Sequence, residues 1–278
     1  MDITEYLNRI NLKSADTTLF KKEMKDVKLV KDGKETKESI TGISTYTFFE
    51  NGSAGVVGFL RYENDFPEQV FSIDPTILNK ILELTDSIEI EDTFLVGKSK
   101  YGEIKRDLNL EKWRTLKIEY ENEPLEISNE IIQRIIKTDN IIDSAYITME
   151  GDGKNLIITL FPKMTNSEAK IVIPSKIKTS YKFSSFTFME VLKILGTSNV
   201  KFYMDNIQHE ERKNLPLKIE LTDTNAQISY YITEVIVEVA ENESNKKPVE
   251  NSEKDSDDDF ENEDNIDIKE SVNEDDEF

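Results

Sequence analysis

The sequence predicts an α+β fold in which antiparallel strands dominate and a few helices recur at regular places. Three observations carry this prediction: short apolar alternations separated by turn residues, a strand–helix–strand unit that occurs three times, and an acidic final segment of different composition. Long parallel strands alternating with helices are disfavoured because so few segments have helical length. The residues before the acidic segment suit one large β-rich domain or two domains of about 120 residues each.

Strands are predicted where short runs alternate apolar and polar residues and are rich in β-branched and aromatic types. These runs are residues 25–31, 43–49, 56–62, 145–149, 155–160, 169–173 and 217–221. Asp32-Gly33, Asn51-Gly52 and Gly151-Asp152-Gly153 lie between such runs. They are residues that tolerate positive φ, so they predict hairpin turns.

The helices are predicted inside the repeated unit, which spans residues 71–86, 125–139 and 182–198. Each copy has a strand, a polar cap, an amphipathic helix of about ten residues and a turn at a threonine, before another strand follows. The expected caps are Asp74 followed by Pro75, Ser128, and Ser184 or Ser185; the threonines are Thr85, Thr138 and Thr197.

Composition excludes several kinds of site. The chain has no cysteine and one histidine, His209, which lies in a polar segment predicted to be a surface loop. A disulfide framework, a thiolate or His-rich metal site and a cysteine nucleophile are therefore excluded. We expect no cofactor, no metal and no catalytic residue. Without an apolar run of about 18 residues or a signal-peptide pattern, we expect a soluble intracellular protein with no membrane partner.

Charge is concentrated at the end of the chain. The formal charge is −21, and residues 241–278 contribute 17 acidic and 4 basic side chains, a net of −13 that leaves −8 on residues 1–240. So few apolar residues occur in the final segment that we expect it to be disordered. This tail, ending in Phe278, is either solubilising or a protein-docking tail like those of single-stranded-DNA-binding proteins.

Two strands near the end of the body carry a family resemblance. Residues 215–221 read Leu-Pro-Leu-Lys-Ile-Glu-Leu, and residues 227–232 read Gln-Ile-Ser-Tyr-Tyr-Ile. Together with the repeated unit, they resemble DNA sliding clamps of the proliferating cell nuclear antigen (PCNA) type, and residues 125–173 are also similar to phage clamps. The resemblance covers roughly residues 71–235. It implies clamp domains at residues 1–110 and 124–240, joined by a linker at 111–123 and followed by the tail. It also implies an earlier helix in the first domain, at either residues 3–10 or residues 18–25.

The resemblance implies a processivity factor for DNA polymerase, without enzymatic activity, that encircles duplex DNA as a homotrimer and is opened by a clamp loader. The bases that would face DNA phosphates are Lys80, Arg134, Lys137 and Lys193. The alternative for these four residues is an ordinary solvated face of an amphipathic helix. Subunits would pair through strands near residues 103–110 and 168–173. Richness in Lys, Asn and Ile suggests an AT-rich, viral or phage genome, hence the cytoplasm of a prokaryotic host.

The resemblance also implies a surface that binds partner proteins, formed by Trp113, Leu116, Tyr231, Ile232 and Val235. Trp113 has a second interpretation, as an anchor that packs the linker onto a sheet. The Leu-Ala-Pro that usually follows the paired tyrosines is replaced here by Ile232-Thr233-Glu234. The alternative function is a single-stranded-DNA-binding replication protein, which needs a groove that combines aromatic and basic residues.

Overall fold

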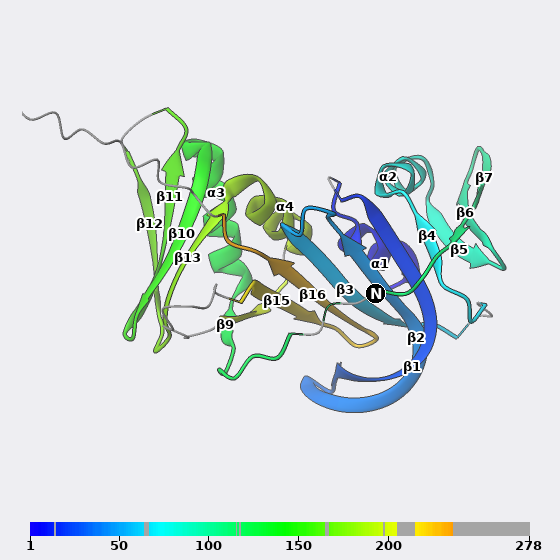
Figure 1. Cartoon of the computed structure of the whole chain (residues 1–278), viewed down its shortest axis with the longest axis horizontal. Coiled ribbons are helices and arrows are strands. Elements are labelled where there is room, and N and C mark those ends of the chain that lie inside the picture. The colour runs from blue at the N-terminus through cyan, green and yellow to red at the C-terminus, as the bar shows by residue number, and fades with distance from the viewer. Residues whose placement is uncertain are drawn as a thin grey trace, which may run out of the picture. The chain divides into compact units, whose positions relative to one another are not determined.

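The structure of the chain, a computed structural model, describes residues 1–235 apart from 14, 64–66, 115, 117, 165–166, 197 and 205–214 (Figure 1). The predicted disordered tail and His209 lie outside the described residues. The described residues all belong to one compact unit, Met1–Ile236. No helix in the described part of the chain is long and apolar enough to cross a membrane.

The described chain contains four similar units, in each of which a helix is followed by three strands. The first unit has α1 (Ile3–Ile10), β1 (Thr17–Lys31), β2 (Lys34–Phe48) and β3 (Ala54–Arg61). The second has β4 (Phe71–Ile73), α2 (Pro75–Leu84), β5 (Ser87–Glu91), β6 (Phe94–Ser99) and β7 (Gly102–Asp107), and β8 (Asn109–Leu110) follows it. The third has β9 (Leu125–Ile127), α3 (Asn129–Ile142), β10 (Ser144–Asp152), β11 (Asn155–Pro162) and β12 (Ala169–Pro174). The fourth has β13 (Lys178–Ser184), α4 (Ser185–Leu195), β14 (Val200–Tyr203), β15 (Leu217–Thr222) and β16 (Ala226–Ile232).

The strands form three antiparallel sheets in the described part of the chain. The largest has nine strands in the order β8-β4-β1-β2-β3-β16-β15-β14-β9, and the others have the orders β12-β11-β10-β13 and β5-β6-β7. Strands β3 and β16 pair from Ala54 opposite Ile232 to Leu60 opposite Ala226, so hydrogen bonding runs without a break from the first half to the second. The predicted α+β class with mostly antiparallel sheets is confirmed. The domain limits at residues 110 and 123 stay a prediction.

The first helix is α1, at the first of the two positions that the sequence suggested. The Asp2 carboxylate accepts a hydrogen bond from the Glu5 backbone N–H at 2.8 Å, and Tyr6, Leu7 and Ile10 are buried on one face. The competing segment, residues 18–25, is strand, because β1 pairs with β2 along its whole length. The helix prediction for residues 18–25 was therefore wrong.

Helix α3 is longer than the sequence suggested. A turn was expected at Thr138, but the Thr138 hydroxyl donates to the Arg134 carbonyl oxygen at 2.8 Å and the helix continues to Ile142. A threonine hydroxyl that donates to a carbonyl oxygen of its own helix has a hydrogen-bond partner without ending the helix. The helix ends where Asp143 takes a left-handed conformation with φ of 50°. In α2 the predicted end at Thr85 is confirmed.

The hairpin of β1 and β2 turns where the sequence predicted. Lys31 is opposite Lys34, and Asp32 and Gly33 between them have φ of 51° and 74°. Two consecutive residues with positive φ form the type I′ turn that suits the twist of a two-stranded ribbon. Gly52 and Gly153 also have positive φ in the other predicted turns.

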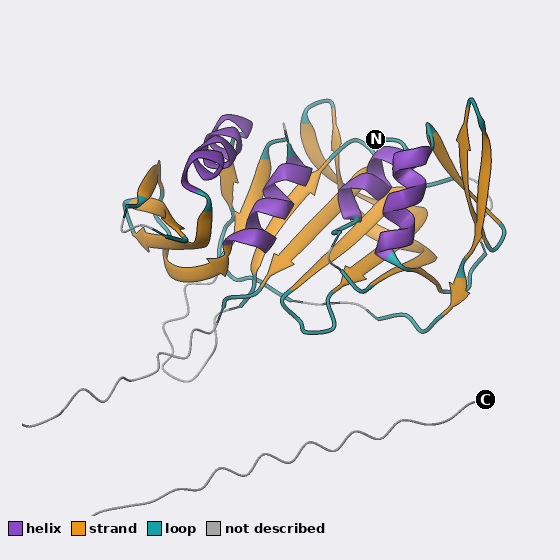
Figure 2. Ribbon diagram, turned by 90° about the horizontal axis from the view of Figure 1, so that it is seen from above, coloured by secondary structure: helices purple, strands orange, loops and turns teal. Residues whose placement is uncertain are grey.

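The helices form a continuous row in the order α2, α1, α4, α3, with contacts between neighbours. In Figure 2 they lie together on one side of the strands. The apolar stripes predicted for α2, α3 and α4 pack in the main core, which also contains residues of all three sheets; of the stripe residues, Leu82, Ile131 and Ile136 are only partly buried. The buried stripe residues are Leu78, Ile81, Ile132, Ile135, Phe188, Val191, Leu192 and Leu195. Because one face of each helix is buried, the other face of the row is available to a ligand.

Candidate nucleic-acid interface and partner-docking surface

The four bases predicted to face DNA lie on the exposed side of the helical row. Lys80 belongs to α2, Arg134 and Lys137 to α3, and Lys193 to α4, and all four residues are exposed. The structure therefore brings residues from distant parts of the sequence onto one layer. Helix α1 adds Arg9, whose guanidinium is engaged within the chain, 3.1 Å from the Glu5 carboxylate and 3.0 Å from the Ser198 hydroxyl.

The helical row is not strongly basic, although its exposed faces were expected to be positive. Each helix contains as many acidic as basic residues, so the formal charge of each is zero. The acids are Glu5 on α1, Glu83 on α2, Glu130 and Asp139 on α3, and Glu190 on α4. Because phosphate affinity rises with the number of uncompensated bases, such a surface can attract a nucleic-acid backbone only weakly.

Two further lysines lie beside this row and were not predicted. Lys13 follows α1 and Lys163 follows β11, and with Lys193 they line a hollow of about 630 Å³. The ammonium of Lys163 is 3.0 Å from the Asp143 carboxylate, and Phe186, 69% exposed, borders the same hollow. Lys13 and Lys163 lie in connections without periodicity, so only the folded topology could bring them to this place.

The predicted linker crosses the strands and is held to the sheet in both halves of the molecule. In the first half, the Lys21 ammonium is 5.7 Å from the centre of the Trp113 ring, and the Arg114 guanidinium is 5.7 Å from that of Phe48. In the second half, the Tyr120 hydroxyl donates to the Pro216 carbonyl oxygen at 2.5 Å. Trp113 is half-buried, which fits its interpretation as an anchor and still leaves part of the ring exposed.

Tyr231 belongs to a row of aromatic side chains on the same face of the sheet. Phe48, Gly55 and Tyr231 are directly opposite one another on adjacent strands, so their side-chain directions coincide. A methyl group on Gly55 would come 3.3 Å from the Tyr46 ring, so a larger residue would crowd this ring. With glycine, no side chain covers the backbone at this point between the aromatic residues. Burial and the nearby Glu220 carboxylate raise the pKa of Tyr231 to about 12, so its hydroxyl stays protonated.

The other predicted docking residues differ in accessibility. Ile232 is 1% exposed and belongs to the hydrophobic core, so its side chain can support a docking surface only from below. Leu116 is half-buried, and Val235 is 42% exposed. The sequence analysis missed Tyr46 and Phe48, which stack at 5.1 Å between ring centres. The alternation of residues 43–49 predicted the strand. The aromatic residues on one face of that strand were the signal from which this surface could have been predicted.

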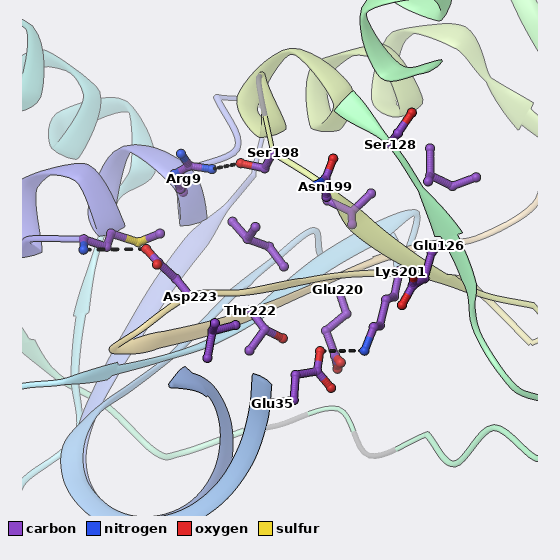
Figure 3. A pocket seen from close by; sticks show the side chains of 15 residues that line it. Arg9, Glu35, Glu126, Ser128, Ser198, Asn199, Lys201, Glu220, Thr222 and Asp223 are labelled. Atoms are coloured by element: carbon purple, nitrogen blue, oxygen red, sulfur yellow. Dashed lines mark hydrogen bonds and ion pairs between the residues drawn. The ribbon is translucent and has the colours of Figure 1, made fainter. Parts of the chain in front are cut away.

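A second hollow, of about 560 Å³, lies between the end of α1, strands β14 and β15, and the β1–β2 hairpin (Figure 3). Two of its basic groups are engaged within the chain: the Lys201 ammonium is 2.5 Å from the Glu35 carboxylate, and Arg9 bonds to Ser198. Within the described residues, no group of three or more His, Cys, Asp or Glu side chains is placed to hold a metal ion. The ion pair of Lys201 with Glu35 holds the hairpin to the second half of the sheet.

Two six-residue strands, β7 and β12, lie at sheet edges in the regions predicted for subunit pairing. The opposite edge of the four-stranded sheet is partly covered, since the Val235 N–H donates to the Lys182 carbonyl oxygen at 2.9 Å. The Glu234 carboxylate also accepts from the Lys182 N–H, at 3.1 Å. Edge strands present unpaired backbone groups that can bond to another strand.

The chain is similar in structure to PCNA from two organisms. No protein-family model matches the sequence, and no curated protein matches it. The structure of the C-terminal region of FEN-1 bound to A. fulgidus PCNA matches with a TM-score of 0.60 and 14% identity, covering 84% of this chain and 96% of that chain. PCNA from Entamoeba histolytica matches with a TM-score of 0.57 and 15% identity, covering 84% of this chain and 94% of that one. The chain therefore has the PCNA-like sliding clamp fold, which confirms the predicted resemblance.

Proposed function

We propose that the chain is a DNA sliding clamp, a non-enzymatic processivity factor that encircles duplex DNA and tethers replication proteins. The observation that carries the proposal is the clamp fold over 84% of the chain, with a continuous row of helices on one side of the sheets. Three copies form the ring, and the protein acts inside a cell, together with a DNA polymerase and a clamp loader. A viral or phage source belongs to the same proposal, because the sequence is rich in Lys, Asn and Ile, as the products of AT-rich genomes are.

The helical row faces the DNA in this proposal. Lys80, Arg134, Lys137 and Lys193 contact phosphates without reading bases, and the acids on the same helices keep these contacts weak. Weak contacts suit a ring, because retention comes from encirclement and tight phosphate binding would slow sliding. Partner proteins dock on the opposite face of the sheet, where Trp113 and the 7% exposed Tyr231 lie, and Leu116 and Val235 belong to the same proposed docking set.

The DNA-facing assignment is tested by changing the four bases of the row to alanine together. We expect polymerase stimulation by the loaded clamp to fall several-fold while the oligomeric state is unchanged, since these side chains contact DNA and not another subunit. The matched control changes four exposed lysines of the β1–β2 hairpin, Lys28, Lys31, Lys34 and Lys37, which removes the same charge. Normal stimulation by the helix variant, or an equal loss in the control, contradicts the assignment.

A further inference from the structure

The hollow beside the helical row combines an aromatic ring, ammonium groups and amides. It lies between α4, the ends of α1 and α3 and the start of β10, and its volume is about 630 Å³. That volume is within the range of about 300–1,000 Å³ found for small-molecule sites. Because the lining residues all belong to one chain, the hollow exists whatever the number of copies that assemble.

Phe186 gives the hollow an accessible aromatic ring. It belongs to the first turn of α4 and is 69% exposed, whereas Met189 on the next turn is buried. Phe188 of the same helix stacks on Phe183 in the core, at 5.7 Å between ring centres. Phe186 therefore lies outside the core on a well-anchored helix, where its ring can stack on a flat ligand.

The ammonium groups at the hollow can hold a phosphate, although only weakly. Lys193 is exposed and has no ion-pair partner in the described part of the chain. The Lys13 ammonium is 4.0 Å from the Glu83 carboxylate, and exposed pairs of this kind contribute little. The Lys163 ammonium is shared with Asp143. Lys193 is therefore the cation most available to a ligand.

The carboxylates that line the hollow are engaged within the chain. The Asp139 carboxylate accepts hydrogen bonds from the hydroxyls of Ser144 and Ser185. The Glu190 carboxylate accepts from the Lys13 backbone N–H at 2.7 Å. Three carboxylates and three lysines give the lining a formal charge of zero. A ligand that carries phosphate must therefore gain most of its affinity from its uncharged part.

The opposite wall of the hollow contains a buried amide with an unused acceptor. Asn11 is 3% exposed, and its side-chain N–H donates to the Pro75 carbonyl oxygen at 3.3 Å. The Asn11 Oδ1 has no hydrogen-bond partner among the described residues. A buried acceptor without a partner is costly, so a donor placed beside it is favoured. With a small movement of this side chain, an amino group on a base edge would supply the donor.

We propose that the hollow binds one unpaired nucleotide, with the base stacked on Phe186, the base edge at Asn11 and the phosphate at Lys193. An aromatic ring combined with nearby bases is the arrangement that holds single strands. Bases within a duplex are stacked on each other and have no free face for Phe186, so paired DNA does not fill the site. The ligand is thus a single strand or a free nucleotide, and this site goes beyond the phosphate contacts of the proposed clamp.

The test measures binding of the full-length chain to a labelled single strand of about 15 nucleotides by fluorescence anisotropy, with the matching duplex as the reference. We expect weak, saturable binding that is about fivefold tighter for the single strand. Phe186→Leu should weaken it about tenfold, because leucine keeps the apolar volume without the ring, and Phe186→Trp should keep it. Because Phe186 is exposed, both variants should have the unfolding midpoint of the unsubstituted chain.

The phosphate contact is tested separately. Lys193→Ala should weaken binding by a few-fold and reduce its dependence on salt concentration. The matched control, Lys34→Ala, removes the same charge from the tip of the β1–β2 hairpin and should leave binding unchanged. Equal weakening by the two lysine variants would overturn the placement of the phosphate.

The remaining outcomes decide the ligand. Displacement of the labelled strand by deoxyadenosine monophosphate supports a site that accepts a free nucleotide, whereas a sensitivity to Phe186→Leu without displacement supports a site that needs a continuous strand. Equal affinity of the unsubstituted, leucine and tryptophan proteins overturns the stacked base. No binding of either ligand overturns the inference for a trimer and for a monomer alike, and the oligomeric state, measured separately, decides the proposed function.

Discussion

The second and fourth units of the chain have the same order of elements, but they differ at the strand that directly follows the helix. In the fourth unit this strand is paired on both sides, and in the second unit it is paired on one side. In the fourth unit, β14 lies between β9 and β15, whereas in the second unit β5 pairs with β6 alone. On its other side, β5 has no partner strand in the described part of the chain. The Ile88 N–H on that side instead donates to the Thr4 hydroxyl of α1, at 2.9 Å. A helix side chain thus supplies one hydrogen-bond acceptor in place of a strand.

The first half contains a longer hairpin than the second half. Strands β1 and β2 have 15 residues each, against 9 and 8 for β10 and β11 in the third unit. The additional length packs Val27 and Leu29 against Phe59 in a separate small cluster. It also reaches the second half through the ion pair of Glu35 with Lys201. The two halves therefore differ in where their strands are paired: β14 has a strand on each side, whereas the first half has an open side at β5 and a longer ribbon.

The largest expected effect comes from matched substitutions in the core, one on a central strand and one on the edge strand β5. Ile219→Ala on β15, between two strands, should lower the free energy of unfolding by about 4 kcal/mol, and Ile90→Ala on the edge strand β5 by about 2 kcal/mol. Both side chains are buried, but the surroundings of an edge strand can relax more around the cavity. Urea unfolding of each variant measures the difference. Equal losses would show that the open side of β5 does not matter.

A smaller effect on stability is expected from two glutamates, Glu220 in the second half and Glu23 in the first. Each carboxylate lies beside a lysine ammonium and a hydroxyl group. Burial opposes ionisation of Glu220, but the Lys218 ammonium, 2.6 Å away, and the Tyr203 hydroxyl hold its pKa below the ordinary value. For Glu23, burial is likewise outweighed by the Ser44 hydroxyl and Lys21, so its pKa is also lowered. A lowered pKa stabilises the fold above the ordinary pKa of glutamate, and this stability is lost as pH falls through the lowered value.

Glu220→Gln should therefore cost about 2 kcal/mol at pH 7 and flatten the loss of stability between neutral and acidic pH. Glu23→Gln should cost less, about 0.5 kcal/mol, because the Glu23 side chain is 24% exposed against 2% for Glu220. Unfolding midpoints measured from pH 7 down to pH 3 test both expectations. A Glu220→Gln variant that keeps the full pH dependence would assign that dependence to other groups.

The sequence predicted the periodic elements well because their patterns are local. The stripes of α2, α3 and α4 and the turn at Asp32-Gly33 follow from spacing and φ preferences that neighbouring residues determine. What it missed depends on contacts between distant residues. Residues 18–25 have no local preference that separates helix from strand, and pairing with β2 decides their structure.

The candidate surfaces were predicted less completely than the fold. The exposure of the four helix bases followed from their position opposite the apolar stripes. Their neutralisation by acids on the same helices was readable from the sequence but was not weighed. Ile232 was named with Tyr231 because the two are adjacent in a motif, but adjacent residues of a strand face opposite sides, and Ile232 faces the core.

The central claim is that three copies of this chain close into a ring. Light scattering coupled to size-exclusion chromatography of the full chain tests it most directly, because one chain has a mass of 32.1 kDa. We expect a species of three times that mass that persists on dilution and does not bind linear single-stranded DNA tightly. A monomer that binds linear single strands tightly would contradict the clamp and support the single-stranded-DNA-binding alternative.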